Sequence, residues 1–199
     1  MSDGFAGDTC LSLFKAVWDT GALDWPQGSR VLEIGCAEGD WMTPMRRLRP
    51  DLQIVGIDWR CADPRPCEVI RADVLTHDWP WRTFDVVVGI SSIEHIGLGH
   101  YDHDPIAEDG DRHCMERVVR WLKPGGQVYL DVPYGNQYTV CGTAHRVYDD
   151  AAIASRLLVP GLRETRRWYS LGGGHGLHDT PLIRPETMSY VALVARKES

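Results

Sequence analysis

The chain lacks any run of about eighteen apolar residues, the length that a transmembrane helix needs, so we expect no membrane-spanning segment. Its first residues, Met1–Gly4, lack the positive charge that begins a secretory signal peptide. The six cysteines are scattered and form no C-x-x-C pair, which argues against a disulfide framework. Together these absences predict a cytoplasmic protein with free thiols and no membrane partner.

An excess of positive charge is lacking as well. The formal net charge is −7, whereas proteins that bind phosphate backbones usually need a basic surface. Arg163, Arg166 and Arg167 could form a local basic patch, but nucleic acid is not favoured as a partner. A small-molecule partner fits the composition better, and association into a homo-oligomer stays open.

Internal repeats and low-complexity tracts are also absent. The 199 residues can bury one sizeable core but hardly two, and a hydrophobic content of 43% is ordinary for a globular chain. We therefore predict a single domain over residues 1–199, in which residues 1–29 form an N-terminal helix and a linker.

The apolar periodicity and the positions of turn residues indicate strands that alternate with helices, which predicts an α/β fold. A helix spanning 149–158 is expected to be capped by Asp149 or Asp150. The other expected helices are 8–20, 39–48 and 110–122. The expected strands are 30–34, 53–57, 68–71, 85–90, 127–132, 163–170 and 189–196, and residues 59–67 are expected to form a loop.

The stretch Val31–Gly39 is the most informative segment. An apolar run ends in the acid Glu33 and passes into a turn of small residues that contains Gly35 and Gly39. Such a turn joins a buried parallel strand to a helix and leaves room for a nucleotide-like ligand against the backbone. The next strand ends in Asp58, whose carboxylate can accept two hydrogen bonds from a ribose diol.

Two classes of cofactor compete for this turn. A dinucleotide fold requires G-x-G-x-x-G, with a pyrophosphate over the helix N-terminus. Here the spacing is Gly35-x-x-x-Gly39, with the carboxylates of Glu33 and Glu38 close by. Two carboxylates repel a pyrophosphate but tolerate an amino-acid ammonium group. The charges therefore disfavour a nicotinamide dehydrogenase.

Glu33, Gly35, Ala37 and Gly39 fit the pattern acid-x-Gly-x-Gly/Ala-x-Gly, and the later strands follow at matching distances. In this the chain resembles the class I S-adenosylmethionine (SAM) methyltransferases. The resemblance implies a Rossmann-like, mostly parallel seven-stranded sheet with an antiparallel last strand and helices on both faces. It implies SAM as the cofactor and S-adenosylhomocysteine as the product.

The resemblance also assigns roles to positions along the chain. Asp58 would bind the ribose hydroxyls, Trp59 would lie beside the adenine, and Asp73 would accept the adenine amino group while the N–H of Val74 meets a ring nitrogen. Ser91 stands at the exit of the fourth strand, toward which the methionine part points. The expected cofactor-binding residues are Glu33, Gly35, Cys36, Ala37, Gly39, Asp58, Trp59, Asp73, Val74 and Ser91.

A narrower resemblance rests on the segments 91–101, 109–111, 123–126 and 145–148. It is to a family of methyltransferase-like domains of undefined substrate, some of them found beside enzymes of glycan biosynthesis. This resemblance implies a hydroxyl of a sugar, a glycan or a natural product as the methyl acceptor.

Catalysis is expected after the fourth and fifth strands, where the methyl group would emerge. His95 has a reference pKa near 6.5, which suits a base that removes a hydroxyl proton at neutral pH. His100 is an equal candidate for this role. Alternatively, His95 only packs beneath the following loop and orients Glu94.

The loop 97–113 gathers histidines and carboxylates before a helix. Such residues could hold a divalent metal that polarises a hydroxyl. Their spacing matches no recognised ligand pattern, so a solvated acidic loop, with Asp109 or Asp111 capping the helix, is favoured and no metal site is predicted.

Candidate substrate residues are Glu94, Tyr134 and His145. Aromatic rings and imidazoles near strand ends suit a hydroxylated ligand such as a sugar, although simple packing of Tyr134 is the alternative. The glycine-rich segment 172–178 is interpreted as a substrate-side loop or a plain connection.

The favoured function is a SAM-dependent O-methyltransferase that acts on a small molecule, with His95 or His100 as the base. An N-methyltransferase is the nearest alternative, since a neutral amine needs less help from a base. A SAM-binding partner protein without chemistry of its own is the third.

Overall fold

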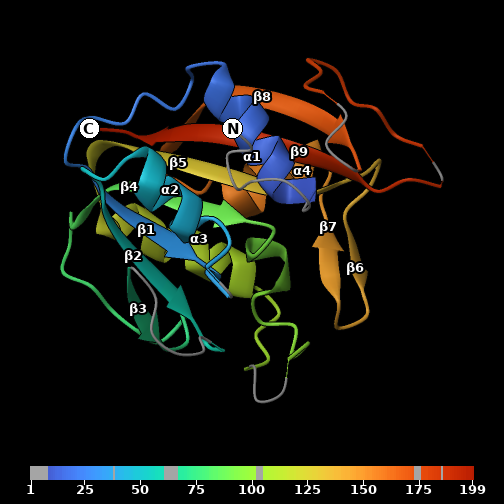
Figure 1. The fold of residues 1–199 in the computed structure, drawn as a ribbon. Helices are drawn as coiled ribbons and strands as arrows, with labels where there is room; N and C mark the ends of the chain where they lie inside the picture. Colours follow the sequence, from blue (N-terminus) through green and yellow to red (C-terminus); the bar gives the residue numbers. More distant parts are fainter. Residues whose placement is uncertain (1–8, 38, 61–66, 102–104, 173–175, 185) are drawn as a thin grey trace.

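The computed structural model describes residues 9–37, 39–60, 67–101, 105–172, 176–184 and 186–199. The seven strands of the main sheet are β1 (Arg30–Ile34), β2 (Gln53–Asp58), β3 (Glu68–Arg71), β4 (Phe84–Ile90), β5 (Leu122–Tyr134), β8 (Leu162–Leu171) and β9 (Ser189–Lys197). The helices are α1 (Thr9–Asp19), α2 (Met42–Leu48), α3 (Gly110–Trp121) and α4 (Asp150–Ala152), with a 3₁₀ turn η1 (Ile93–His95) and a π-helix η2 (Ile153–Leu157). A hairpin of β6 (Thr139–Cys141) and β7 (His145–Val147) lies outside the main sheet (Figure 1).

The strand order of the sheet is β3-β2-β1-β4-β5-β9-β8. The first five strands in this order run parallel, and β9 lies antiparallel between β5 and β8. The prediction of a Rossmann-like, mostly parallel seven-stranded sheet with an antiparallel last strand is therefore confirmed. From β1 the chain adds β2 and β3 on one side of the sheet, and β4 and β5 then lie on the other side of β1. An open α/β sheet forms its ligand crevice where the strand order reverses in this way.

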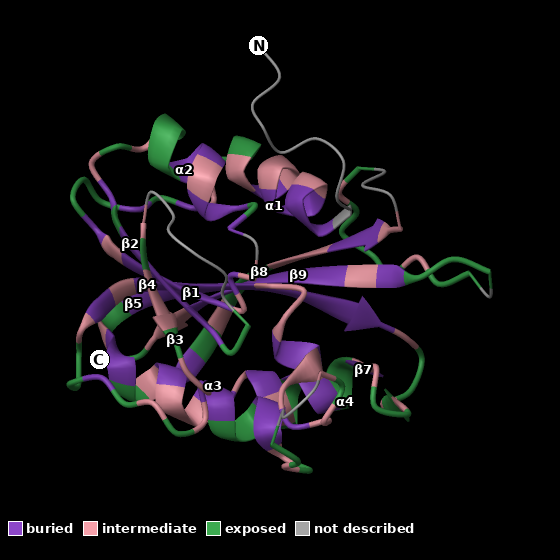
Figure 2. Cartoon of the chain, turned by 60° about the horizontal axis from the view of Figure 1, so that its bottom comes forward, coloured by how far each residue is buried: buried purple, intermediate pink, exposed green. Residues whose placement is uncertain are grey.

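Helices cover both faces of the sheet, as predicted. Figure 2 shows α1 and α2 on one face and α3 and α4 on the other. Two separate apolar clusters fill the interfaces, one beneath α1 and α2 and one beneath α3 and η2. Because both faces are covered, β1 and β4 are buried along nearly their whole length, which explains their continuous apolar sequences. No described helix is long and apolar enough to cross a membrane.

Three local predictions need correction, and one element was missed. The helix after the glycine turn begins at Met42 rather than at residue 39, because Gly39 has φ +76°, outside the helical region. The helix expected over 149–158 is a short α4 followed by the π-helix η2, although Asp149 caps it as predicted by accepting from the N–H of Ala152 at 2.7 Å. The strand expected over 127–132 extends from Leu122 to Tyr134. The β6–β7 hairpin was not predicted.

Candidate functional site

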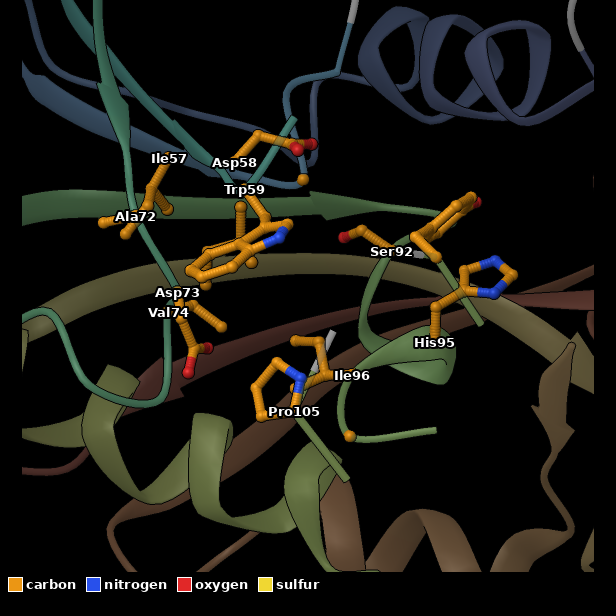
Figure 3. A pocket seen from close by; sticks show the side chains of 14 residues that line it. Ile57, Asp58, Trp59, Ala72, Asp73, Val74, Ser92, His95, Ile96 and Pro105 are labelled. Carbon is orange, nitrogen blue, oxygen red and sulfur yellow. The ribbon is translucent and has the colours of Figure 1, made fainter. Parts of the chain in front are cut away.

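A cleft opens at the carboxyl ends of β1, β2, β3 and β4. Its empty space is about 640 Å³ when the open space at its mouth is included. Figure 3 shows Trp59, Asp73 and Val74 on one side of the cleft and Ser92 and His95 on the other. Residues from the ends of four parallel strands therefore meet around one cleft.

The floor of the cleft is the glycine turn after β1. Gly35 has φ +76°, and a Cβ at this position would lie 2.4 Å from the Cβ of Ser92. Only glycine fits both the conformation and the space. Ala37 and Gly39 also have positive φ, and the turn closes through the bond from the Gly39 N–H to the carbonyl of Cys36. The sequence pattern thus produces a backbone loop that a ligand can approach closely.

Asp58 links the turn to the end of β2. One carboxylate oxygen accepts from the N–H of Ala37 at 2.9 Å, and the other accepts from the N–H of Arg60 at 2.7 Å. A carboxylate oxygen has about two acceptor sites, which is why an acid at this position suits a hydroxylated ligand. The same carboxylate can fix the turn and bind a diol.

Trp59 and Asp73 border the cleft on the β2–β3 side. The Trp59 side chain remains 39% exposed, so a flat ring could stack on it. One carboxylate oxygen of Asp73 accepts from the N–H of Leu75 at 2.8 Å, which shapes the turn after β3 and places Val74 against the cleft.

The exit of β4 bends sharply at Ser91, which has φ +43°. Its N–H donates to the carboxylate of Asp131 at 2.9 Å, and its hydroxyl donates to Glu94 at 2.8 Å. Ser91 therefore shapes the bend, while the next residue, Ser92, lines the cleft. The Ser92 hydroxyl is buried without a hydrogen-bond partner among the described residues, so a ligand could satisfy it. Sequence reasoning missed Ser92.

Glu94 lies behind this exit with 1% of its surface exposed. Burial raises the pKa of its carboxyl to about 7, although the hydroxyl of Ser91 and the charge of Arg146 act in the opposite direction. Glu94 therefore titrates near neutral pH. Its second oxygen has no hydrogen-bond partner within the described parts of the chain.

His95 faces the cleft with its side chain 25% exposed. Its Nδ1 bonds to the carbonyl oxygen of Ala144, and because a carbonyl can only accept, Nδ1 carries the proton. In the neutral ring Nε2 is then the acceptor, at 3.7 Å from a carboxylate oxygen of Glu94. Burial lowers the pKa of His95 below its usual value, as do the charges of His100, His145 and Arg60, so the ring is neutral at pH 7.

Two further predicted residues lie next to His95. The ring of His100 stacks on His95 with a centroid distance of 5.9 Å, and the ring of His145 meets it nearly edge-on at 6.3 Å. Tyr101, which lines the cleft, lies 4.5 Å from His100. Both candidate bases thus lie at one end of the cleft, but His95 lines it directly while His100 is exposed.

Arg146 supports this end of the site from within. Its side chain is fully buried, and it donates to the carbonyls of Glu94, Ile96 and Glu108 at 3.2, 2.7 and 3.0 Å. Its Nε lies 3.6 Å from a carboxylate oxygen of Asp111. The strand β7 is therefore tied to the η1 turn through both Arg146 and the carbonyl that binds His95.

The prediction of a solvated acidic loop is wrong for Asp111. This residue has no exposed surface and accepts from Tyr148 at 2.9 Å and from Arg156 at 2.7 Å. Asp109 is the N-cap of α3 but its side chain makes no capping hydrogen bond. A buried carboxylate needs such partners, which the local sequence does not reveal. Residues 102–104 of this loop lie outside the described residues.

Other expected site residues lie away from the cleft lining. Glu33 is buried in β1 at 4% exposure, and Cys36 packs beneath the turn, where a Cβ on Gly56 would lie 2.7 Å from its sulfur. Tyr134 is buried in β5 and meets Tyr169 edge-on at 4.9 Å. Glu38 and residues 173–175 of the glycine-rich segment lie outside the described residues. Among those described, no group of three His, Cys, Asp or Glu residues could hold a metal ion.

Comparison with solved structures decides the fold. The N-methyltransferase NodS of Bradyrhizobium japonicum, solved with S-adenosylhomocysteine, superposes with a TM-score of 0.62 at 16% identity, covering 98% of this chain and 91% of that one. The 1,6-didemethyltoxoflavin-N1-methyltransferase of Burkholderia thailandensis gives 0.63 at 14% identity, covering 94% and 77%. This chain has the class I SAM-dependent methyltransferase fold.

Sequence relatives of this methyltransferase-fold chain include both O- and N-methyltransferases. The ubiquinone biosynthesis O-methyltransferase of Cereibacter sphaeroides is 30% identical over 81% of this chain and 57% of its own length. A phosphoethanolamine N-methyltransferase of Triticum aestivum is 32% identical over 54% of this chain and 21% of its own length. The chain thus spans about half or less of these relatives. A family model described as Caenorhabditis protein of unknown function, DUF268, matches residues 69–163.

Proposed function

We propose that the chain binds SAM in the cleft and transfers its methyl group to a hydroxyl of a small molecule, a sugar or a natural product, with release of S-adenosylhomocysteine. One observation carries the proposal: a single cleft joins Asp58 and Trp59, after β2, to Ser92 and His95, after β4. The first pair suits an adenosine, and the second pair suits the reacting end of the same molecule.

Different residues of the cleft would bind different parts of the cofactor. The carboxylate of Asp58 would receive the ribose hydroxyls, and the exposed ring of Trp59 would stack on the adenine. Asp73 and the backbone of Val74 border the same side. The turn at Gly35 brings bare backbone to the ligand.

The proposed reaction is a direct displacement. The bound cofactor supplies an activated methyl group, which the acceptor oxygen takes as the carbon–sulfur bond breaks and its electron pair stays on sulfur. His95 would accept the hydroxyl proton at Nε2, the nitrogen left unprotonated by the bond of Nδ1 to Ala144. The walls of the cleft would align the oxygen with the methyl carbon.

N-methylation is the second candidate, and it is favoured by the N-methyltransferases among the relatives and the superposed structures. A neutral amine is already nucleophilic, so His95 would matter less to the rate. A non-catalytic SAM-binding protein is the third candidate, and the alignment of His95 with the cleft argues against it.

A cytoplasmic location and a single-domain organisation belong to the same proposal. Cys67, Cys114 and Cys141 are free thiols, and the described strands form one main sheet with a core on each face. Both features agree with a small enzyme of a reducing compartment.

The test is isothermal titration calorimetry of the purified protein with S-adenosylhomocysteine, with NAD as a parallel control. Binding of S-adenosylhomocysteine at micromolar concentration, and none of NAD, is the expected result. Binding of NAD alone, or of neither compound, would contradict the proposal. A positive result justifies a screen of hydroxylated acceptors, with amines as the comparison set.

A further inference from the structure

The His95 end of the cleft carries a cluster of cationic and aromatic side chains, of which the proposed reaction uses only His95. We define the imidazole cluster as His95, His100, His145, Tyr101 and Arg60. The guanidinium carbon of Arg60 lies 3.5 Å from the ring centroid of Tyr101, which in turn lies 4.5 Å from His100. These residues come from four segments: the end of β2, the η1 turn, the loop after it, and β7.

The cluster places one fixed positive charge beside the cleft. Arg60 is a permanent cation, and the imidazole rings of His100 and His145 face His95. Two carboxylates are near: Glu94 lies 3.7 Å from His95, and Asp58 lies 3.9 Å from Arg60. At 3.9 Å the Asp58 carboxylate partly offsets the charge of Arg60, and the raised pKa of Glu94 leaves that carboxyl partly neutral near pH 7. The cluster therefore offers an incoming group one guanidinium and several ring N–H donors.

The cluster also holds a hydrogen-bonding group that nothing described satisfies. The Nε2 of His145 is buried without a hydrogen-bond partner among the described residues. Leaving a buried polar atom unpaired costs free energy, so such an atom often marks the place of a missing ligand or water. His100, in contrast, is exposed and could reach an incoming molecule.

The chemistry of the cluster matches an oxyanion. A guanidinium packed on an aromatic face still offers its N–H edge to a carboxylate or a phosphate, and imidazole N–H groups bind the same oxygens. A metal ion is a poorer match, since no group of three ligating side chains stands together in the described part of the chain.

We infer that the imidazole cluster binds an anionic group, a carboxylate or a phosphate, on the methyl acceptor. The acceptor class becomes a small hydroxylated molecule that carries an oxyanion. The inference rests on the proposed function, because it assumes that the acceptor enters at His95. A bound anion would also offset the cationic neighbours of His95, so the imidazole becomes a stronger base once the acceptor is in place.

The test uses the full chain saturated with S-adenosylhomocysteine and follows its histidine imidazole signals by NMR. Inorganic phosphate and acetate are titrated separately, at constant ionic strength set with chloride. We expect saturable shifts of the His95, His100 and His145 signals, and a rise in the apparent pKa of His95. Saturation by phosphate alone assigns a phosphate, saturation by acetate alone assigns a carboxylate, and saturation by both supports either.

The matched variants are R60M and R112M. Arg60→Met removes the fixed cation, so the anion should bind at least about tenfold more weakly, because a charge-assisted contact is lost. Arg112 lies on the exposed side of α3, paired with Glu116, and its replacement should change nothing. S-adenosylhomocysteine affinity reports whether each variant is folded.

Two results would overturn the inference. Absence of saturable shifts from both anions, in protein that binds S-adenosylhomocysteine, would refute the anion site while leaving the proposed function intact. Equal anion binding in R60M and the unchanged protein would do the same. Failure to bind S-adenosylhomocysteine at all is a different outcome, because it removes the proposed function on which the inference rests.

Discussion

At the scale of single residues, Asp58 has two tasks, because the carboxylate that fixes the glycine turn is also the proposed ribose ligand. Replacement of Asp58 by alanine should weaken S-adenosylhomocysteine binding by about 1.5–3 kcal/mol for each hydrogen bond lost to the charged group, at least about tenfold in Kd. Calorimetry measures this directly. Asp19→Ala, at an exposed pair with Lys15, is the control. Unchanged affinity in the Asp58 variant would refute the ribose assignment.

His95 is the residue on which the choice between O- and N-methylation depends. His95→Asn should lower kcat roughly 10²–10⁴-fold with a hydroxyl acceptor, while S-adenosylhomocysteine affinity stays nearly constant. Since the pKa of His95 lies below its usual value and the neutral ring is the base, activity should rise with pH through that lowered pKa and then level off.

The measurement is a pH profile of kcat with the first acceptor found, and the control is His100→Asn. Normal turnover in the His95 variant but a loss in the His100 variant would move the base to His100. Normal turnover in both variants would favour an amine acceptor.

Glu94 makes stability depend on pH. Its pKa is about 7 in the folded chain and 4.5 in the reference state, so the folded protein holds a proton that the unfolded chain releases. Stability contributed by the neutral carboxyl is full below about pH 4.5 and is lost as pH rises through 7, a change of about 3 kcal/mol at most. Glu94→Gln keeps an oxygen for Ser91 and should remove this dependence.

Urea denaturation at pH 5 and pH 8 would measure the effect as a difference between the two proteins. That difference cancels the opposite contribution of His95, whose lowered pKa makes stability rise with pH. The glutamine variant should gain stability relative to the parent at pH 8. An equal response of both proteins to pH would show that the carboxyl titrates normally.

At the scale of elements, the site depends on how β7 is joined to the η1 turn. Arg146 binds three backbone carbonyls there and has no exposed surface. Arg146→Met should cost about 3–5 kcal/mol of unfolding free energy, since it leaves buried carbonyls and part of the Asp111 charge without a donor.

Urea denaturation tests this prediction, and Arg112→Met is the matched control. Arg112 makes an exposed i,i+4 pair with Glu116, and such pairs contribute only about 0.3–0.5 kcal/mol. A similar cost in the two variants would mean that the Arg146 contacts add little to stability.

Prediction from sequence succeeded for elements that are long enough to show an apolar pattern with turn residues at both ends. The strands β1, β2 and β4 are largely apolar runs bounded by turn residues, and each was located within one residue of its observed ends. The β6–β7 hairpin and the η1 turn are only three residues long per element, too short to show any periodicity. The π-helix η2 replaces part of an expected α-helix, and nothing in its composition distinguishes the two.

Part of the candidate site could likewise be predicted from the sequence, and part could not. Gly35, Asp58 and His95 stand at strand ends, so their place in one cleft follows from the topology of a parallel sheet. Arg146 lies 52 residues from Glu94 in sequence, and Arg60 meets Tyr101 only through tertiary packing. Local sequence shows none of these contacts, and so the imidazole cluster and its support emerge only in the folded chain.

At the scale of the whole molecule, the cleft lies between β1 and β4, in the middle of the sheet, and its walls come from both halves of the chain's topology. A ligand there contacts only the folded state, so binding must stabilise the entire fold. At a concentration of about 100 times Kd, S-adenosylhomocysteine should add about 2.7 kcal/mol, which raises Tm by about 5–10 °C for a chain of this size.

Differential scanning fluorimetry over a series of S-adenosylhomocysteine concentrations measures this shift, with NAD as the control. The size of the shift should follow the logarithm of ligand concentration, because the stabilisation is RT ln(1 + [L]/Kd). The Asp58→Ala variant should need proportionally more ligand for the same shift, which separates weaker binding from a damaged fold. Equal shifts from both compounds would instead indicate nonspecific stabilisation. A shift from NAD alone would contradict the argument that the carboxylates near the glycine turn favour SAM over a dinucleotide.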